Sequence, residues 1–192
     1  PYSFWARAGS SHHLLIYFQG GGGCWNAATC GPGSSFFDAV VDSGDSPDLR
    51  AGIFDLQNPE NPFAEYDILY IPSCTGDVHW GDNQLAFPQA DGGNLDVHFK
   101  GFVNAQAALD WAFQHFSRPQ SVFVTGCSAG SVGSAAHVPY VIEQFPDVPV
   151  SQLGDSLAFV FHRPLNLSDY GTYENFAPWI SPHDPYEPNI DK

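Results

Sequence analysis

The pentapeptide Gly-Cys-Ser-Ala-Gly at residues 126–130 carries the strongest chemical signal in the sequence. It follows the apolar run at residues 121–125 and precedes a stretch of small residues. A Gly-x-Ser-x-Gly sequence between a strand and a helix places its serine on a sharp turn, where the glycines permit close backbone approach and the hydroxyl is exposed. This elbow predicts that Ser128 is the nucleophile of an acyl-transfer enzyme. A Gly- and Ser-rich helix start with no catalytic role is the alternative.

Four consecutive glycines, residues 20–23, are the second signal, and we call them the Gly-rich loop. They follow the apolar run at residues 13–19 and precede the elbow by about 105 residues. Acyl transfer needs N–H donors aimed at the developing oxyanion, and a Gly-rich loop after an early strand supplies them in α/β-hydrolases. A flexible turn would explain the glycines equally well. Together with the elbow, they favour an α/β-hydrolase-like acyl hydrolase.

Apolar runs and helical spacings alternate along the chain. Residues 101–117 carry apolar side chains three and four positions apart, which predicts an amphipathic helix that ends before Pro119. A second helix is expected over residues 137–145, ending before Pro146. Short apolar runs bounded by turn residues predict strands at residues 13–19, 66–72, 121–125 and 149–153.

Strands that alternate with helices predict a parallel sheet with helices on both faces. We therefore expect an α/β fold, an α/β-hydrolase-like three-layer sandwich with a mostly parallel central sheet. Residues 42–61 and 83–94 are rich in Gly, Pro, Asp and Asn and are expected to be loops. With 192 residues, 43% of them hydrophobic, residues 1–192 are expected to belong to a single domain.

Charge and composition exclude several classes of partner. Six Lys and Arg against 21 Asp and Glu give a formal net charge of -15, which repels nucleic acids and other polyanions. No run approaches the roughly 18 apolar residues of a membrane span. No histidine and carboxylate cluster has metal-ligand spacing, so neither a metal nor another cofactor is expected.

The cysteines indicate the compartment. Their spacing fits no zinc site, and an even number in an acidic, Lys-poor chain is compatible with disulfides and an extracellular, secreted protein. The short interval between Cys24 and Cys30 is the simplest bridge to imagine, although three pairings are possible and buried free thiols are the alternative. The other two cysteines are Cys74 and Cys127.

Three blocks of the sequence resemble the signatures of the pectin acetylesterase family, which includes the Notum-like carboxylesterases. They are LLIYFQGGGGCWNAATC, YIPSCTGDVHWGDN and VTGCSAGSVGSAAHVPYV, at residues 14–30, 70–83 and 124–141. The resemblance runs from about residue 2 to residue 160 and implies a serine esterase. We expect a bacterial-type member whose chain is incomplete or processed, since it contains no methionine.

The resemblance also implies roles for individual residues. Ser128 matches the nucleophile, and Ala129 matches the oxyanion donor beside it. Gly21 and Gly22 match the donors of the Gly-rich loop. Gly23 stands where relatives often carry an aromatic residue, so the acyl pocket is expected to differ.

Other polar and aromatic residues have two interpretations each. Asp77 and His79 follow the second strand, where α/β sites gather, but the favoured interpretation is a polar surface loop. Four aromatic residues either stack on sugar rings or belong to the core. They are Trp25, Trp80, Phe87 and Trp179.

The base and acid that Ser128 needs follow the nucleophile in this architecture, yet only 64 residues remain. By resemblance, Asp155 belongs to a structural or substrate-side block, and His137 belongs to the helix behind the elbow. His162 and His183 lie in a proline-rich segment. Relatives carry the acid and histidine beyond the point where this chain ends. The chain is therefore expected to hold the N-terminal and central part of the domain, with the rest on a longer or second polypeptide.

The expected function is that of a serine carboxylesterase. It removes acyl groups, in the simplest case acetyl, through an acyl-enzyme on Ser128. The negative charge disfavours polyanionic pectin, so the expected partner is a neutral acylated carbohydrate or a small ester. The alternative is a catalytically incomplete α/β-hydrolase-fold protein with a carbohydrate-binding or structural role.

Overall fold

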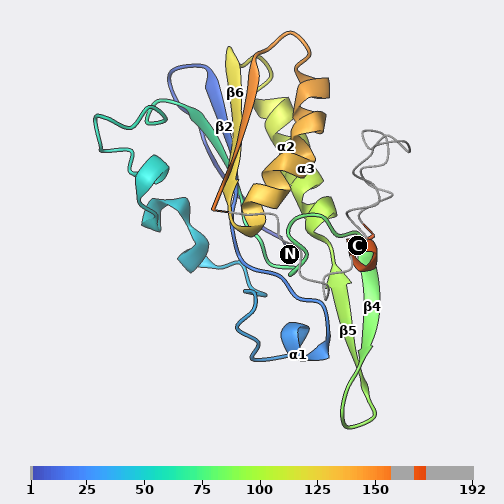
Figure 1. Ribbon diagram of the computed structural model, residues 1–192. Helices are drawn as coiled ribbons and strands as arrows, with labels where there is room; N and C mark the ends of the chain where they lie inside the picture. Colours follow the sequence, from blue (N-terminus) through green and yellow to red (C-terminus); the bar gives the residue numbers. More distant parts are fainter. Residues whose placement is uncertain (1, 157–166, 172–192) are drawn as a thin grey trace.

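A five-stranded sheet organises the part of the protein that the computed structural model describes, residues 2–156 and 167–171. The strand order is β1-β3-β2-β6-β7, and only β1 is antiparallel to its neighbour (Figure 1). This confirms the predicted α/β fold with a mostly parallel sheet flanked by helices. The strands are β1 (Trp5–Arg7), β2 (His13–Phe18), β3 (Asp67–Ile71), β6 (Ser121–Cys127) and β7 (Val150–Asp155).

Strand β2 lies at the centre of this sheet because its apolar residues are buried on both faces. Its last residue, Phe18, is paired with Ile71 of β3 and with Gly126 of β6. Parallel strands end at the same edge of a sheet, where sites in α/β proteins collect. The register therefore brings the Gly-rich loop, which follows β2, next to the elbow, which ends β6.

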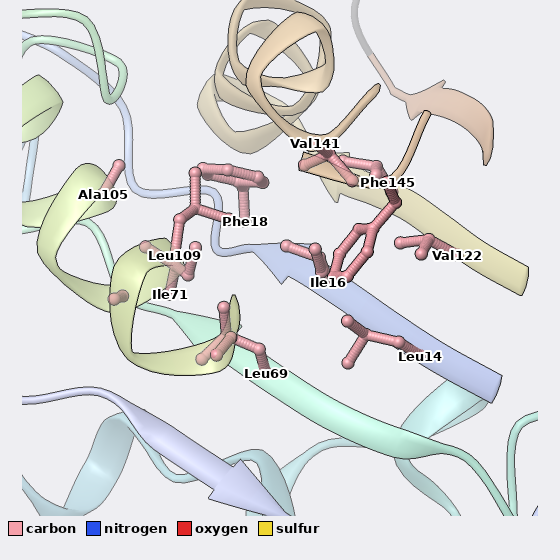
Figure 2. Packing of buried hydrophobic residues seen from close by; sticks show 13 residues of the cluster. Leu14, Ile16, Phe18, Leu69, Ile71, Ala105, Leu109, Val122, Val141 and Phe145 are labelled. Atoms are coloured by element: carbon pink, nitrogen blue, oxygen red, sulfur yellow. The ribbon is translucent and has the colours of Figure 1, made fainter. Parts of the chain in front are cut away.

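Helices α2 (Gly101–His115) and α3 (Ala129–Gln144) pack on one face of the sheet (Figures 1 and 2). The expected helix over residues 101–117 is confirmed. Helix α3 begins directly after Ser128, so the small residues before residue 137 are helical, earlier than expected. Alternate residues of β2 and β3 point into this core, which contains Leu14, Ile16, Phe18, Leu69, Ile71, Ala105, Leu109, Val141 and Phe145.

The opposite face is covered by the segment that runs from β2 to β3. This segment has no regular strand, as expected for residues 42–61, but it contains three short 3-10 helices. Its Phe54 packs on Tyr70 and Tyr17 with ring centroids 5.3 and 4.8 Å apart. The 3-10 helices are η1 (Ser43–Asp45), η2 (Pro47–Leu49) and η3 (Gly52–Phe54).

The expectation of a loop at residues 83–94 is wrong. Strands β4 (Asn83–Pro88) and β5 (Asn94–Phe99) form an antiparallel hairpin that extends away from the central sheet (Figure 1). The exposure of β4 alternates residue by residue, because Leu85 and Phe87 turn towards a small separate core. The Asn, Asp and Gly residues that suggested a loop lie at the ends and turn of the hairpin.

A disulfide joins Cys24 to Cys30 across the short helix α1 (Ala27–Cys30), which is the simplest of the bridges that the sequence left open. Cys74 and Cys127 are free thiols. Tyr170, in the 3-10 helix η4 (Leu167–Tyr170), donates its hydroxyl to the carbonyl of Cys24 at 2.8 Å. Among the described residues, no helix combines the length and apolar character needed to cross a membrane.

Candidate active site

Ser128 occupies a strained turn between β6 and α3. Its φ of 55° and ψ of -120° lie outside the regions that non-glycine residues normally adopt. Two hydrogen bonds hold the turn, one from the N–H of Ser128 to the carbonyl of Asp155 at 2.9 Å and one from the N–H of Ser131 to the carbonyl of Ser128 at 2.9 Å. Ser128 is exposed at the surface. The strand, turn and helix context required for a nucleophile elbow is therefore present.

The glycines of the elbow are needed because the backbone packs against β2. A Cβ on Gly130 would lie 1.9 Å from the carbonyl oxygen of Phe18. A Cβ on Gly126 would lie 2.2 Å from the carbonyl oxygen of Gly130. Both distances are far below van der Waals contact, so any side chain at either position would displace the turn.

The Gly-rich loop starts against Ser128. A Cβ on Gly20 would lie 2.4 Å from the carbonyl oxygen of Cys127 and 3.3 Å from the Cβ of Ser128. Gly21 is next to Ser73, and Gly22, with φ of 74°, lies against the backbone of Phe36. Sequence reasoning overlooked the contact of Gly20. Extending the β2–β6 register beyond Phe18 and Gly126 would have revealed it.

Three backbone amides that the sequence singled out have no partner among the described residues. The N–H groups of Gly21, Gly22 and Ala129 donate to no other group in residues 2–156 and 167–171. Ala129 is also the first residue of α3, where N–H groups are unsatisfied and the helix dipole favours negative charge. An unpaired donor directly after the serine, as at Ala129, has the chemistry that an oxyanion requires, whereas Gly21 and Gly22 lie against Ser73 and Phe36.

Ser128 lines a cleft of about 800 Å³ on the sheet face opposite α2 and α3. Gly20 and Cys127 line it as well, and Arg50 contributes a cation. Five aromatic side chains form part of the remaining wall: Tyr17, Phe54, Phe63, Tyr70 and Phe123. A smaller pocket of about 320 Å³, beside β1, contains none of the predicted site residues.

The surface-loop interpretation of Asp77 and His79 is wrong, and neither residue lines the cleft. Only 1% of Asp77 and 2% of His79 is exposed. The Asp77 carboxylate accepts hydrogen bonds from the N–H of Gly101 at 2.7 Å and from the hydroxyl of Thr75 at 2.8 Å. Burial raises the pKa of Asp77 to about 6 and lowers the pKa of His79 to about 4.

His137 is packed in the core, as expected for the helix behind the elbow. Its Nε2–H donates to the carbonyl of His79 at 2.8 Å, and its Nδ1 accepts from the amide of Gln106 at 3.0 Å. Burial lowers its pKa to about 3. Since both ring nitrogens are engaged, His137 is not placed to act as a base for Ser128.

Among the described residues, the structure places no histidine beside the Ser128 hydroxyl. No hydrogen bond joins the Ser128 hydroxyl to a histidine within the described ranges, and His13 pairs with Ser121 at the other end of the sheet. His162 and His183 lie outside the described residues. Asp155 lies at the end of β7 and lines the cleft, while its carbonyl accepts the N–H of Ser128.

The aromatic residues considered as sugar platforms lie elsewhere. Trp25 packs edge-on against Phe36, and the indole N–H of Trp80 donates to a backbone carbonyl of α3. Phe87 packs in the hairpin core. None of these three lines the cleft, and Trp179 is not among the described residues. In that same part of the chain, no group of three His, Cys, Asp or Glu side chains is arranged to hold a metal ion.

A serine on a strained strand-to-helix turn, beside a Gly-rich loop at the carboxyl edge of a parallel sheet, is typical of the α/β-hydrolase class of esterases. Comparison with known families agrees with this class. The family described as Pectinacetylesterase matches residues 2–178, and the chain belongs to this family.

The relatives that this chain matches are carboxylesterases, and their sequence identity to the chain is low. The chain is 28% identical to mouse (Mus musculus) palmitoleoyl-protein carboxylesterase NOTUM over 177 residues, which are 88% of this chain and 34% of the relative. It is 27% identical to Arabidopsis thaliana pectin acetylesterase 4 over 165 residues, which are 80% of this chain and 38% of the relative. The chain thus spans about a third of the length of the curated relatives it matches.

Proposed function

We propose that this protein is a serine carboxylesterase with Ser128 as nucleophile. The observation that carries the proposal is the position of Ser128, exposed on a turn with φ of 55° and in contact with the Gly-rich loop. Family membership supports the reaction class, since the relatives named above are esterases.

The proposed reaction has two steps. The Ser128 Oγ attacks the ester carbonyl carbon, its proton passes to a general base, and the oxyanion is stabilised by the N–H groups of Gly21, Gly22 and Ala129. Cleavage of the ester C–O bond releases the alcohol, which takes up the proton, and leaves an acyl group on Ser128. Water then hydrolyses this acyl-enzyme. A histidine and an acid outside the described residues supply the base in this proposal.

We propose a neutral acylated carbohydrate or a small ester as substrate, with acetyl as the simplest acyl group. The net charge of -15 opposes a polyanion such as pectin, and the aromatic side chains of the cleft, beside the oppositely charged Arg50 and Asp155, suit a ligand without net charge. The Cys24–Cys30 disulfide supports a secreted, extracellular location.

The test is hydrolysis of an aryl acetate by the natural full-length protein and its Ser128→Ala variant. We expect the variant to lose at least about a thousandfold in kcat, because the acyl-enzyme cannot form. The exposed Ser3→Ala substitution serves as the matched control. Unchanged turnover in Ser128→Ala would refute the proposal. A fluorophosphonate that fails to label Ser128 would instead support the catalytically incomplete alternative.

A further inference from the structure

Two buried histidines form a chain of hydrogen bonds that ends at the Gly-rich loop. His79 donates Nε2–H to the carbonyl of Gln19 at 2.8 Å, directly before Gly20. His137 donates Nε2–H to the carbonyl of His79 at 2.8 Å. Gln106 donates to Nδ1 of His137 at 3.0 Å. Helices α2 and α3 are thereby connected to the residue from which the Gly-rich loop begins.

The imidazole of His79 is confined by its neighbours. A Cβ on Gly133 of α3 would lie 2.8 Å from its Cδ2, so the helix backbone packs directly on the ring. The ring of Phe18 meets it edge-on, with the centroids 5.2 Å apart. A Cβ on Gly101 of α2 would lie 2.8 Å from the Cα of His79. The imidazole therefore cannot leave the Gln19 carbonyl without displacing a helix or the central strand.

The turn that carries His79 also holds the other end of the Gly-rich loop. The carbonyl of Gly76 accepts the N–H of Cys24 at 2.7 Å. Val78 and His79 adopt φ of 52° and 67°, which is unfavourable, above all for a β-branched residue. Strain of this kind persists only where surrounding contacts fix it. The same strained turn thus fastens the chain both before Gly20 and after Gly23.

We propose that His79 is a positioning residue for the esterase reaction. By fixing the carbonyl of Gln19, its imidazole sets the direction of the Gly21 and Gly22 N–H groups towards the oxyanion. This inference rests on the proposed function, and His79 itself touches no substrate.

The physical need for such a residue follows from the loop itself. Glycines carry no side chains that could pack and hold their amides in one orientation. Oxyanion donors act only when they lie about 2.7–3.1 Å from the charged oxygen, and a displacement of about 1 Å costs on the order of a hundredfold in rate. A loop of four glycines therefore requires fixation from outside, which the buried imidazole provides.

The experiment compares His79→Leu with His79→Gln in the natural full-length protein. Leucine removes the donor, whereas the glutamine amide keeps an N–H at a similar reach. Both side chains lack the short polar group that eases positive φ, so the backbone strain is matched. For aryl acetate hydrolysis by His79→Leu we expect kcat to fall by about ten- to a hundredfold with KM nearly unchanged, and His79→Gln to recover most of this loss.

Transition-state affinity separates positioning from general damage. A trifluoromethyl ketone, which forms a charged adduct with an active-site serine, should lose affinity for His79→Leu in parallel with kcat/KM. Gly133→Ala provides a second variant if His79→Leu fails to fold. Its methyl group pushes the imidazole, while alanine favours the helix by about 1 kcal/mol over glycine. We expect folded protein with kcat reduced by about tenfold.

Three results would overturn the inference. The first is wild-type kcat in folded His79→Leu or Gly133→Ala. The second is an equal loss in the leucine and glutamine variants, because the donor would then be irrelevant. The third is full turnover by Ser128→Ala, which overturns the proposed function as well. If Ser128→Ala loses turnover but the His79 and Gly133 variants keep the wild-type kcat, this inference is overturned and the proposed function is not.

Discussion

At the scale of single residues, the backbone conformation of Ser128 requires neighbouring residues that have no side chains. A serine with positive φ costs free energy, on the order of 1–3 kcal/mol, and persists only when its surroundings enforce it. The surroundings here are Gly126 and Gly130, which let the turn sit directly on the end of β2. Backbone contacts thus fix the exposed position of Ser128.

The substitution Gly130→Ala tests this dependence. Its methyl group would lie 1.9 Å from the carbonyl oxygen of Phe18, so the elbow must move away from β2. We expect the free energy of unfolding to fall by about 1–3 kcal/mol and kcat/KM to fall by roughly a hundredfold. Urea denaturation and aryl acetate hydrolysis measure the two effects.

The matched control is Gly33→Ala, where the added Cβ meets nothing within 4 Å. Gly33 has φ of 79°, so alanine there costs about 1 kcal/mol of backbone strain without touching the site. Its kcat/KM should stay at the wild-type value. Equal activity of the Gly130→Ala and Gly33→Ala variants would contradict the role assigned to the elbow glycine.

At the scale of elements, the turn after β3 determines where α2 begins. Lys100, the N-cap residue of α2, makes no side-chain cap, and the buried carboxylate of Asp77 accepts the first helical N–H instead, from Gly101. A carboxylate at a helix N-terminus also interacts favourably with the helix dipole. A residue 24 positions away in the sequence therefore caps the helix.

We expect Asp77→Ala to lower the free energy of unfolding by about 2–4 kcal/mol, because it leaves the N–H of Gly101 and the hydroxyl of Thr75 without their buried partner. Asp110→Ala, which removes an exposed carboxylate from the same helix, should change stability by less than about 0.5 kcal/mol. Thermal and urea unfolding of the two variants provide the comparison. A similar loss of stability in both variants would show that the stabilisation comes from negative charge and not from the helix cap.

The sequence predicted those elements whose signal is local. The apolar run of β2 and the helical spacing of α2 were identified because burial on two faces, or on one helical face, is visible in consecutive residues. The β4–β5 hairpin was missed because its polar composition concealed the alternation of β4. The buried state of Asp77 and His79 depends on partners far along the chain, Gly101 and Gln19, and polarity alone suggests a surface.

At the scale of the whole molecule, buried titratable groups connect stability to pH. The depressed pKa values of His79 and His137, about 4 and 3, mean that both side chains must gain protons on unfolding below pH 6.5. Their contribution is complete above pH 6.5 and is lost as pH falls through the folded values. Asp77 has the opposite sign, since its pKa is raised from 3.8 to about 6 and its contribution is lost as pH rises through that range.

Between pH 6 and 4, the two histidines take up about two protons on unfolding and Asp77 releases about one, so the unfolding reaction takes up about one proton in total. We therefore expect acidification to lower the free energy of unfolding through these three groups, by on the order of 1 kcal/mol for each pH unit. Urea unfolding at pH 6, 5 and 4 measures the slope. His137→Gln removes one of the two histidine contributions and should flatten it, so an identical slope in the variant would rule out this origin.

The pairing of β2 with β6 has a consequence for folding of the protein during its synthesis. The hydrogen bond between His13 and Ser121 connects residues 108 positions apart. Until the ribosome has made β6, the backbone N–H and C=O groups on one edge of the apolar strand β2 are unpaired and can bind another polypeptide. This edge of β2 is therefore prone to aggregation until β6 emerges, and Ser128 and the Gly-rich loop come together only after β2 and β6 have paired.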